Sequence, residues 1–174
     1  ADLAKDSLDP INKVRCLLAI MASRITFNEP ERALETSKDV FAILKKHNKT
    51  CKYYGFALIY TAAAYMSLEQ FEKALEYYQQ AISIAKNLND KIGLANGYCS
   101  LGVCYVRMKR LRDCLEAYEQ SLKYATQINN VQIMCVSLYN MAESTYELDS
   151  LDQSYELNQR AMEISKRVSS KRIE

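Results

Sequence analysis

A pattern of matched residues recurs every 40 positions along this chain. Five columns of similar size and polarity share this spacing. They are Ala62, Gly102 and Ala142; Phe71, Leu111 and Leu151; Ala74, Cys114 and Ser154; Ala81, Ser121 and Ala161; and Ile84, Tyr124 and Ile164. A fixed period between about 20 and 50 residues is typical of a solenoid, in which each unit contacts only its neighbours. Such a fold predicts an extended binding surface rather than a catalytic pocket.

The composition favours helices throughout. Glycine (4 residues) and proline (2 residues) are scarce among the 174 residues, while good helix formers are common. The 23 basic and 21 acidic residues nearly cancel and are interspersed, so we expect no direct nucleic-acid binding. No apolar run approaches the ~18 residues of a transmembrane helix, so we expect no membrane span.

The cysteine pattern argues against a metal centre. None of the six cysteines forms a CxxC pair, and His47 is the only histidine, so we expect neither a bound metal nor a cofactor. Cys104 and Cys114 occupy small-residue positions of the repeat, where a free thiol packs as a modest apolar group. A regulatory disulfide is the alternative. A reducing, cytoplasmic setting fits free thiols best.

Apolar periodicity and capping residues predict eight helices in antiparallel pairs. Asp9 and Pro10 are typical of a helix start, and Asn28 with Glu31 has the pattern of a capping box that opens the second helix. The expected helices cover about 10–26, 28–46, 52–67, 70–88, 91–108, 110–128, 131–148 and 150–170. The linkers within each pair have two or three residues, which forces antiparallel neighbours.

These pairs predict a single array over 1–174, with repeats at about 10–47, 51–88, 91–128 and 131–170. Asn89–Asp90 and Asn129–Asn130 stand at equivalent joints, where a short side chain caps the next helix. Residues 1–8 have the pattern of a helix end, and the last helix carries Ile164 towards an uncovered face. We therefore expect the chain to be a segment of a longer protein.

The columns together resemble the tetratricopeptide repeat (TPR), over nearly the whole chain. The second unit carries the motif at Leu58, Ala62, Tyr65, Phe71, Ala74, Tyr78 and Ala81. The third carries it at Tyr98, Leu101, Gly102, Tyr105, Leu111, Cys114, Tyr118 and Ser121. The fourth departs from it at Thr145 and Asn158, and the period is 40 rather than about 34 residues. The resemblance implies an all-α, right-handed α-solenoid of about four antiparallel helix hairpins.

In that family the first helix of each pair lines a concave groove, which implies a set of candidate ligand-binding residues. They mix aromatic, apolar, amide and charged side chains: Arg15, Tyr60, Met66, Asn96, Ser100, Arg107, Tyr139, Asn140 and Glu143. Amides can bond a peptide backbone and arginine can hold a carboxylate, while aromatic residues anchor a peptide. The alternative is that each is an ordinary exposed side chain.

No nucleophile with a neighbouring base and no phosphate-binding loop is visible, so we expect no catalytic residue and no enzyme activity. The favoured hypothesis is a non-catalytic protein- or peptide-binding scaffold module within a larger signalling or regulatory protein. The alternative is a sensor for a peptide signal that controls an attached DNA-binding, kinase or nucleotide cyclase domain. Self-association through the apolar last helix, giving a homodimer, is also left open.

Overall fold

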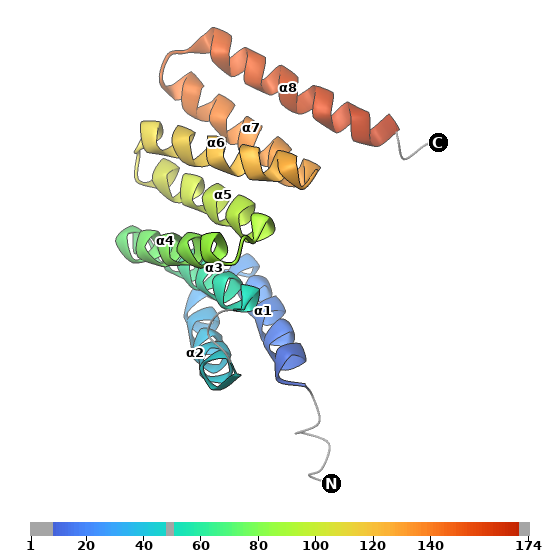
Figure 1. Ribbon diagram of the computed structural model, residues 1–174. Helices are drawn as coiled ribbons and strands as arrows, with labels where there is room; N and C mark the ends of the chain where they lie inside the picture. The colour runs from blue at the N-terminus through green and yellow to red at the C-terminus, as the bar shows by residue number, and fades with distance from the viewer. Residues whose placement is uncertain (1–8, 48–50, 171–174) are drawn as a thin grey trace. The chain divides into compact units, whose positions relative to one another are not determined.

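A computed structural model describes residues 9–47 and 51–170, and these residues form eight helices (Figure 1). The helices are α1 (Pro10–Thr26), α2 (Pro30–His47), α3 (Lys52–Ser67), α4 (Phe71–Asn87), α5 (Lys91–Arg107), α6 (Leu111–Gln127), α7 (Val131–Glu147) and α8 (Leu151–Ser170). The expected helices are confirmed, most of them to within one residue at each end. The helix end expected within residues 1–8 lies outside the described residues.

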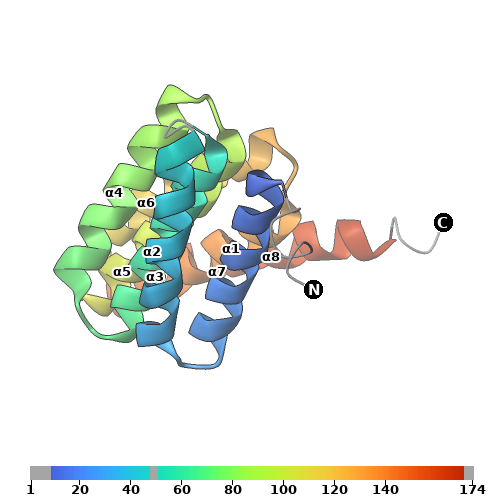
Figure 2. The ribbon, with the colours of Figure 1, turned by 90° about the horizontal axis from the view of Figure 1, so that it is seen from below.

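The helices group into two compact units, residues 1–88 with α1–α4 and residues 89–174 with α5–α8. In each unit, consecutive helices contact each other, and the first helix also contacts the third. Figure 2 shows α1 and α2 lying side by side, joined by a short loop. Each unit is thus a pair of stacked hairpins, while the expectation of a single array over 1–174 stays a prediction.

The short loops share one backbone conformation. One non-glycine residue per loop has a positive φ: Asn28, Glu69, Asn89, Lys109, Asn129 and Asp149, at 51° to 59°. In five of these loops the residue that follows donates its N–H back into the preceding helix, as from Gln70 to the Tyr65 carbonyl at 2.9 Å. Such bonds satisfy carbonyls that a helix end otherwise leaves unpaired, and they offset the cost of the left-handed conformation.

This loop conformation contradicts one sequence-based prediction. Asn28 ends α1 with a φ of 59°, and α2 begins only at Pro30, so the capping box predicted at Asn28 and Glu31 is wrong. At each of the two later joints, one of the two predicted residues caps the next helix. The Asp90 side chain accepts the Gly93 N–H at 3.0 Å. Asn130 in the same way accepts the Ile133 N–H at 3.1 Å.

Close helix packing explains the small-residue columns. Ala62, Ala74, Cys114 and Ala142 are fully buried. At Gly102, an added Cβ would lie only 2.5 Å from Cε1 of Tyr118, a side chain that is 1% exposed. Only glycine lets α5 approach the Tyr118 ring this closely, which confirms the register of this column.

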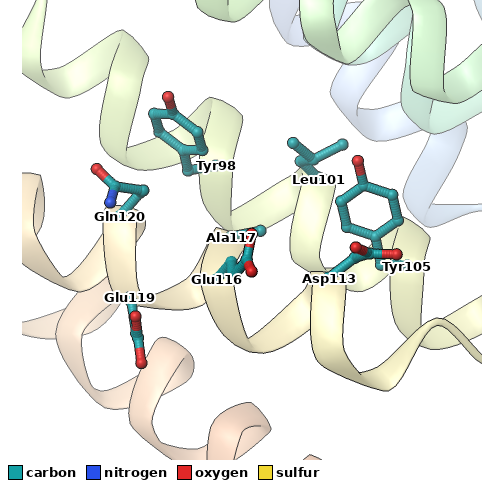
Figure 3. A pocket seen from close by; sticks show the side chains of 8 residues that line it. All are labelled: Tyr98, Leu101, Tyr105, Asp113, Glu116, Ala117, Glu119 and Gln120. Atoms are coloured by element: carbon teal, nitrogen blue, oxygen red, sulfur yellow. The ribbon is translucent and has the colours of Figure 1, made fainter.

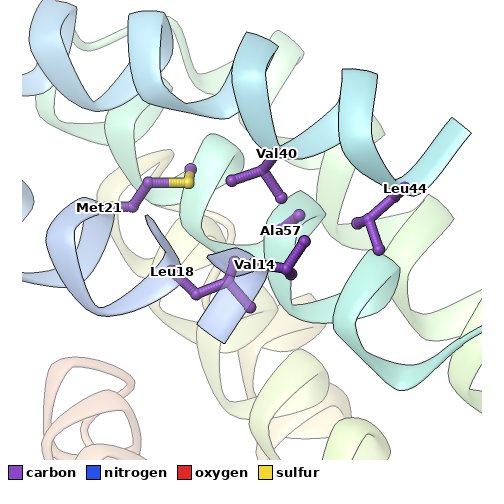
Figure 4. Packing of buried hydrophobic residues seen from close by; sticks show 6 residues of the cluster. All are labelled: Val14, Leu18, Met21, Val40, Leu44 and Ala57. Atoms are coloured by element: carbon purple, nitrogen blue, oxygen red, sulfur yellow. The ribbon is translucent and has the colours of Figure 1, made fainter. Parts of the chain in front are cut away.

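The core of unit 1 is aliphatic. Figure 4 shows its central cluster, drawn from α1, α2 and α3: Val14, Leu18, Met21, Val40, Leu44 and Ala57. Because α3 is contacted by α1, α2 and α4, apolar residues surround it on most sides, and it shows little amphipathic character. Its central place in the unit therefore follows directly from its sequence.

Candidate functional site

The first helices of the two hairpins form one wall of unit 2. The backbones of α5 and α7 lie in contact, whereas within the described residues those of α6 and α8 do not. The backbones of the two first helices therefore approach each other more closely than those of the two second helices. The expectation that first helices line a concave side stays a prediction.

The exposed side of this wall is rich in apolar groups. Ile92 and Val103 of α5 are 51% and 40% exposed. On α7, Val136, Tyr139 and Tyr146 are 41%, 53% and 63% exposed. Their spacing, a step of eleven residues on α5 and steps of three and seven on α7, places them on one side of each helix. These five residues define what we call the α5/α7 face, and apolar side chains gathered in this way are typical of an interaction surface.

Tyr139 is held in place by its own helix. Its hydroxyl donates a hydrogen bond of 2.6 Å to Oε1 of Glu143, one turn further along α7. The carboxylate beside the phenol raises the pKa of Tyr139, because the ionised phenol would face a second negative charge. At neutral pH the ring is therefore protonated and oriented, with its apolar surface open to solvent.

Asn140 is tied to the buried core rather than free on the surface. Its side chain is half-buried and hydrogen-bonds with Tyr118. Burial raises the pKa of Tyr118, so its hydroxyl stays protonated. Asn140 thus connects the α5/α7 face to the largest fully buried side chain of the unit.

The remaining predicted residues of α5 lie along the same wall. Asn96 donates from Nδ2 to the Ile92 carbonyl of its own helix at 3.0 Å, which occupies one of its donors. Ser100 is half-buried and Arg107 is exposed near the end of α5. The structure therefore brings six of the nine predicted residues together on α5 and α7, and the other three belong to unit 1.

The predicted residues of unit 1 differ in accessibility. Arg15 is exposed on α1, where Nη1 donates to Oδ1 of Asn12 at 3.4 Å. Tyr60 is half-buried and packs against the aliphatic cluster of Figure 4. Met66 is only 7% exposed, so little of its side chain is available to a ligand.

A hollow of about 340 Å³ lies between α5 and α6 (Figure 3). Tyr98 and Gln120 lie at one end, and Tyr105 and Asp113 lie at the other. The guanidinium of Arg110 covers the Tyr105 ring at 4.6 Å and bonds Asp113 at 2.6 Å, so this end is partly neutralised. None of the nine predicted residues lines this hollow.

Two further hollows lie beside α8. One, of about 490 Å³, is lined by Ala142, Glu143, Tyr146, Glu147, Ser154 and Asn158. The other, of about 530 Å³, lies where α6, α7 and α8 meet. Of the predicted residues, only Glu143 lines any of these three hollows. The α5/α7 face is therefore a surface for an extended contact rather than an enclosed pocket.

Several accessible residues of this face were missing from the predicted set. Four of its five apolar side chains, those of Ile92, Val103, Val136 and Tyr146, are not among the nine candidate residues. Helical spacing within α5 and within α7 is the signal that groups them.

In the part of the chain that the structure describes, no group of His, Cys, Asp or Glu side chains is placed to hold a metal ion. No helix among these residues has the length and apolarity that crossing a membrane requires.

The comparison with known proteins decides the family. Residues 12–173 match the model of the MalT-like TPR region. The chain belongs to this family of TPR regions. The expected all-α solenoid of helix hairpins is therefore confirmed, as is the resemblance on which it was based.

Individual relatives are more distant. The chain is 26% identical over 127 residues to regulatory protein RapK of Bacillus subtilis (strain 168), a match that covers 72% of this chain and 34% of RapK. Its fold is similar to that of aspartyl phosphate phosphatase F from Bacillus subtilis, with a TM-score of 0.86 at 16% identity, over 93% of this chain and 42% of the other. It is also similar to the TPR-like repeats of a putative kinesin light chain of Podosopora anserina, with a TM-score of 0.74 at 17% identity, over 91% and 77%. The chain spans about a third of the length of RapK.

Proposed function

We propose that this TPR region is a non-catalytic module that binds a protein or peptide on its α5/α7 face, within a signalling or regulatory protein. The observation that carries the proposal is the row of five exposed apolar side chains on two contacting helices. Aromatic and aliphatic anchors surrounded by polar groups are the composition of surfaces that grip peptides.

The charged groups around the face determine which peptides it favours. Arg107 of α5 and Glu143 of α7 are both exposed, and Glu147 pairs with Lys109 at 3.4 Å. A peptide with one large apolar side chain and charges of both signs fits these surroundings. Ser100, Asn96 and Asn140 lie beside the anchors and contribute hydrogen-bonding capacity.

The regulatory relative supports the same class of function. RapK is named a regulatory protein, and its match covers 72% of this chain. Phosphatase F is named for an enzyme activity, but a likeness at 16% identity concerns the fold alone. No catalysis is therefore assigned to this chain. A cytoplasmic setting and a peptide sensor that controls an attached output domain stay predictions.

A selection experiment tests the face directly. Random peptides of about 12 residues are displayed and selected against the 174-residue chain, and the selected peptides serve as the probe. Replacing Tyr139 or Val103 by Ala should weaken their binding by about 10-fold or more, because buried anchors dominate such interfaces.

Tyr155→Ala is the matched control. Tyr155 is 65% exposed, comparable with Tyr139, but it lies on α8 and outside the α5/α7 face. This variant should bind the selected peptides unchanged. Failure to select any peptide, or equal binding by the Tyr139→Ala and Tyr155→Ala chains, would show that the face is not the binding surface.

A further inference from the structure

Helix α8 carries a second exposed apolar surface. Leu151, Tyr155 and Met162 are 61%, 65% and 54% exposed. Steps of four and seven residues place them in one stripe along the helix. Ser154 and Leu157 are buried, and within the described residues α7 is the one helix whose backbone lies close to that of α8. The stripe is therefore exposed among the described residues.

The 40-residue period shows that this stripe occupies packing positions. Tyr155 and Met162 correspond to Leu115 and Leu122 of α6, one period earlier. Both leucines pack against the cluster that contains Leu138 of the following hairpin. The same positions that receive a helix in α6 are thus apolar and open in α8.

The charges of α8 fit a second copy of α8 in the antiparallel orientation. Asp152 lies in the first turn, Lys166 lies 14 positions later, and Gln159 is midway between them. All three are exposed, and their heptad spacing places them on one side, next to the stripe. Antiparallel pairing centred on Gln159 brings Asp152 of each copy opposite Lys166 of the other. Parallel pairing brings like charges together instead.

We propose that two copies of this chain associate through α8, antiparallel, about a twofold axis near Gln159. Tyr155 of each copy then lies beside Met162 of the other, Leu151 lies nearer the end of the contact, and an ion pair closes each end. Such an interface is closed and self-complementary, so assembly stops at the dimer. Gln159 donates from Nε2 to the Tyr155 hydroxyl at 2.6 Å, which holds this ring along the stripe.

Sedimentation over a range of concentrations tests the association. Because the stripe is short, we expect a weak dimer that forms between about 5 and 500 µM. Met162→Lys should raise the dissociation constant by about 10-fold or more, because a charge replaces a central apolar contact. Its far-UV circular dichroism should match that of the unmodified chain, since the side chain is exposed.

Ile92→Lys is the control. Ile92 is 51% exposed, much like Met162, but it lies on the α5/α7 face. This variant should dimerise normally, so loss of peptide binding and loss of dimerisation can be told apart. A dimer weakened equally by Ile92→Lys and Met162→Lys would place the interface elsewhere and overturn the proposal.

A charge exchange tests the orientation. Asp152→Lys alone and Lys166→Asp alone should each weaken the dimer, because each sets like charges opposite one another at both ends. Mixing the two single variants should restore association as a heterodimer, since every end pair is then of opposite sign.

Three outcomes contradict this interface: a monomer at all concentrations, growth beyond the dimer, or single variants that do not recover on mixing. Growth beyond the dimer would indicate head-to-tail contacts, and a chain that stays monomeric would leave the stripe to a different protein partner.

Discussion

The two units are built from the same repeat, yet their helix junctions use different chemistry. In unit 1 the junction of the second and third helices is apolar, with Val40 and Ala57 in the aliphatic cluster. In unit 2 the same junction combines apolar packing, such as that of Leu122 with the cluster around Leu138, with a polar contact. Ser137 of α7 donates to Oγ of Ser121 at 3.0 Å, and Ser121 donates to the Ala95 carbonyl of α5 at 2.9 Å. One chain of hydroxyls thus connects three helices.

Buried polar groups also differ between the units. In unit 1 the Thr61 hydroxyl bonds the Ala57 carbonyl of its own helix at 2.7 Å, and Arg24 of α1 donates to the Thr36 hydroxyl of α2. In unit 2 Cys114 Sγ lies 3.1 Å from Ser144 Oγ of α7, and Ser154 donates to the Ala142 carbonyl at 2.8 Å. Apolar contacts tolerate small shifts, whereas each of these bonds requires one particular partner. Such bonds join all four helices of unit 2.

The largest expected effect comes from the glycine that faces Tyr118. Gly102→Leu should lower the free energy of unfolding by about 3 kcal/mol, because an added Cβ already overlaps a ring that cannot move. Thermal unfolding followed by circular dichroism measures the change. An unchanged melting temperature would contradict the packing described here for α5 and α6.

Gly55 in unit 1 is the matched control. A Cβ there would find its nearest neighbours, the Ala81 carbonyl oxygen and Cγ2 of Ile84, at 3.9 and 4.0 Å. Gly55→Ala should therefore stabilise the chain by about 0.5–1 kcal/mol through helix propensity alone. If the alanine variants at Gly55 and Gly102 change stability in the same direction, the contrast between the two units does not hold at these positions.

The hydroxyl chain gives the next largest effect. Ser121→Ala should cost about 1–2 kcal/mol, because it removes the bond to α5 and leaves the buried Ser137 hydroxyl without its acceptor. Ser137→Ala should cost less, since the bond from Ser121 to Ala95 remains.

A double-mutant cycle distinguishes a chain of bonds from two independent contacts. Ser121→Ala combined with Ser137→Ala should cost less than the sum of the single changes, because the double variant leaves no unpaired hydroxyl. Urea unfolding of the four proteins measures the coupling. Strict additivity would mean that the two serines do not act together.

The repeat could be predicted from sequence because its signal is strong and local. Helical periodicity and a fixed spacing placed the helix ends and the small-residue columns, including Gly102. The left-handed residues were harder to predict, since Glu69 and Lys109 are not residues that this conformation favours. They adopt it because a three-residue connection between antiparallel helices requires it.

The candidate site could be predicted only in outline. The positions on α5 and α7 followed from the repeat, but accessibility depends on neighbours that the sequence does not show. Met66 is buried by its surroundings, and Asn140 is engaged by Tyr118, a contact between residues 22 positions apart. The hydrogen bonds of Ser121 and Ser137 could not be predicted for the same reason. Ser121 and Ser137 meet only when three helices are stacked.

The starts of α3 and α7 provide a smaller contrast between the units. Asn130 caps α7 through its side chain, whereas Cys51 at the start of α3 makes no side-chain cap bond. Asn130→Ala should lower the free energy of unfolding by about 1 kcal/mol, and Cys51→Ser should raise it by about 0.5 kcal/mol. Thermal unfolding of both variants checks the signs. Loss of stability in Cys51→Ser would mean that the packing of this thiol outweighs the gain from a cap.

The smallest effect at neutral pH concerns the thiols of unit 2. Burial raises the pKa of both Cys99 and Cys114. As the pH rises through about 8.5, these thiols ionise in the unfolded chain but stay protonated in the folded one. The unfolded state then binds fewer protons, so the free energy of unfolding falls with increasing pH. The stabilisation is complete below this range and is lost above it.

Replacing one of these thiols should reduce the loss of unfolding free energy with increasing pH. Cys114→Ala should lose stability at pH 7 through its small cavity, but the further loss between about pH 7 and 9.5 should be smaller than in the unmodified chain. Val40→Ala removes buried apolar volume from unit 1 and leaves the thiols of unit 2 in place, so it should keep the original pH dependence. Urea unfolding at the two pH values compares the three proteins. Parallel curves for all three would show that the thiols of unit 2 do not contribute to alkaline sensitivity, and the two units would then differ only in their hydroxyl bonds.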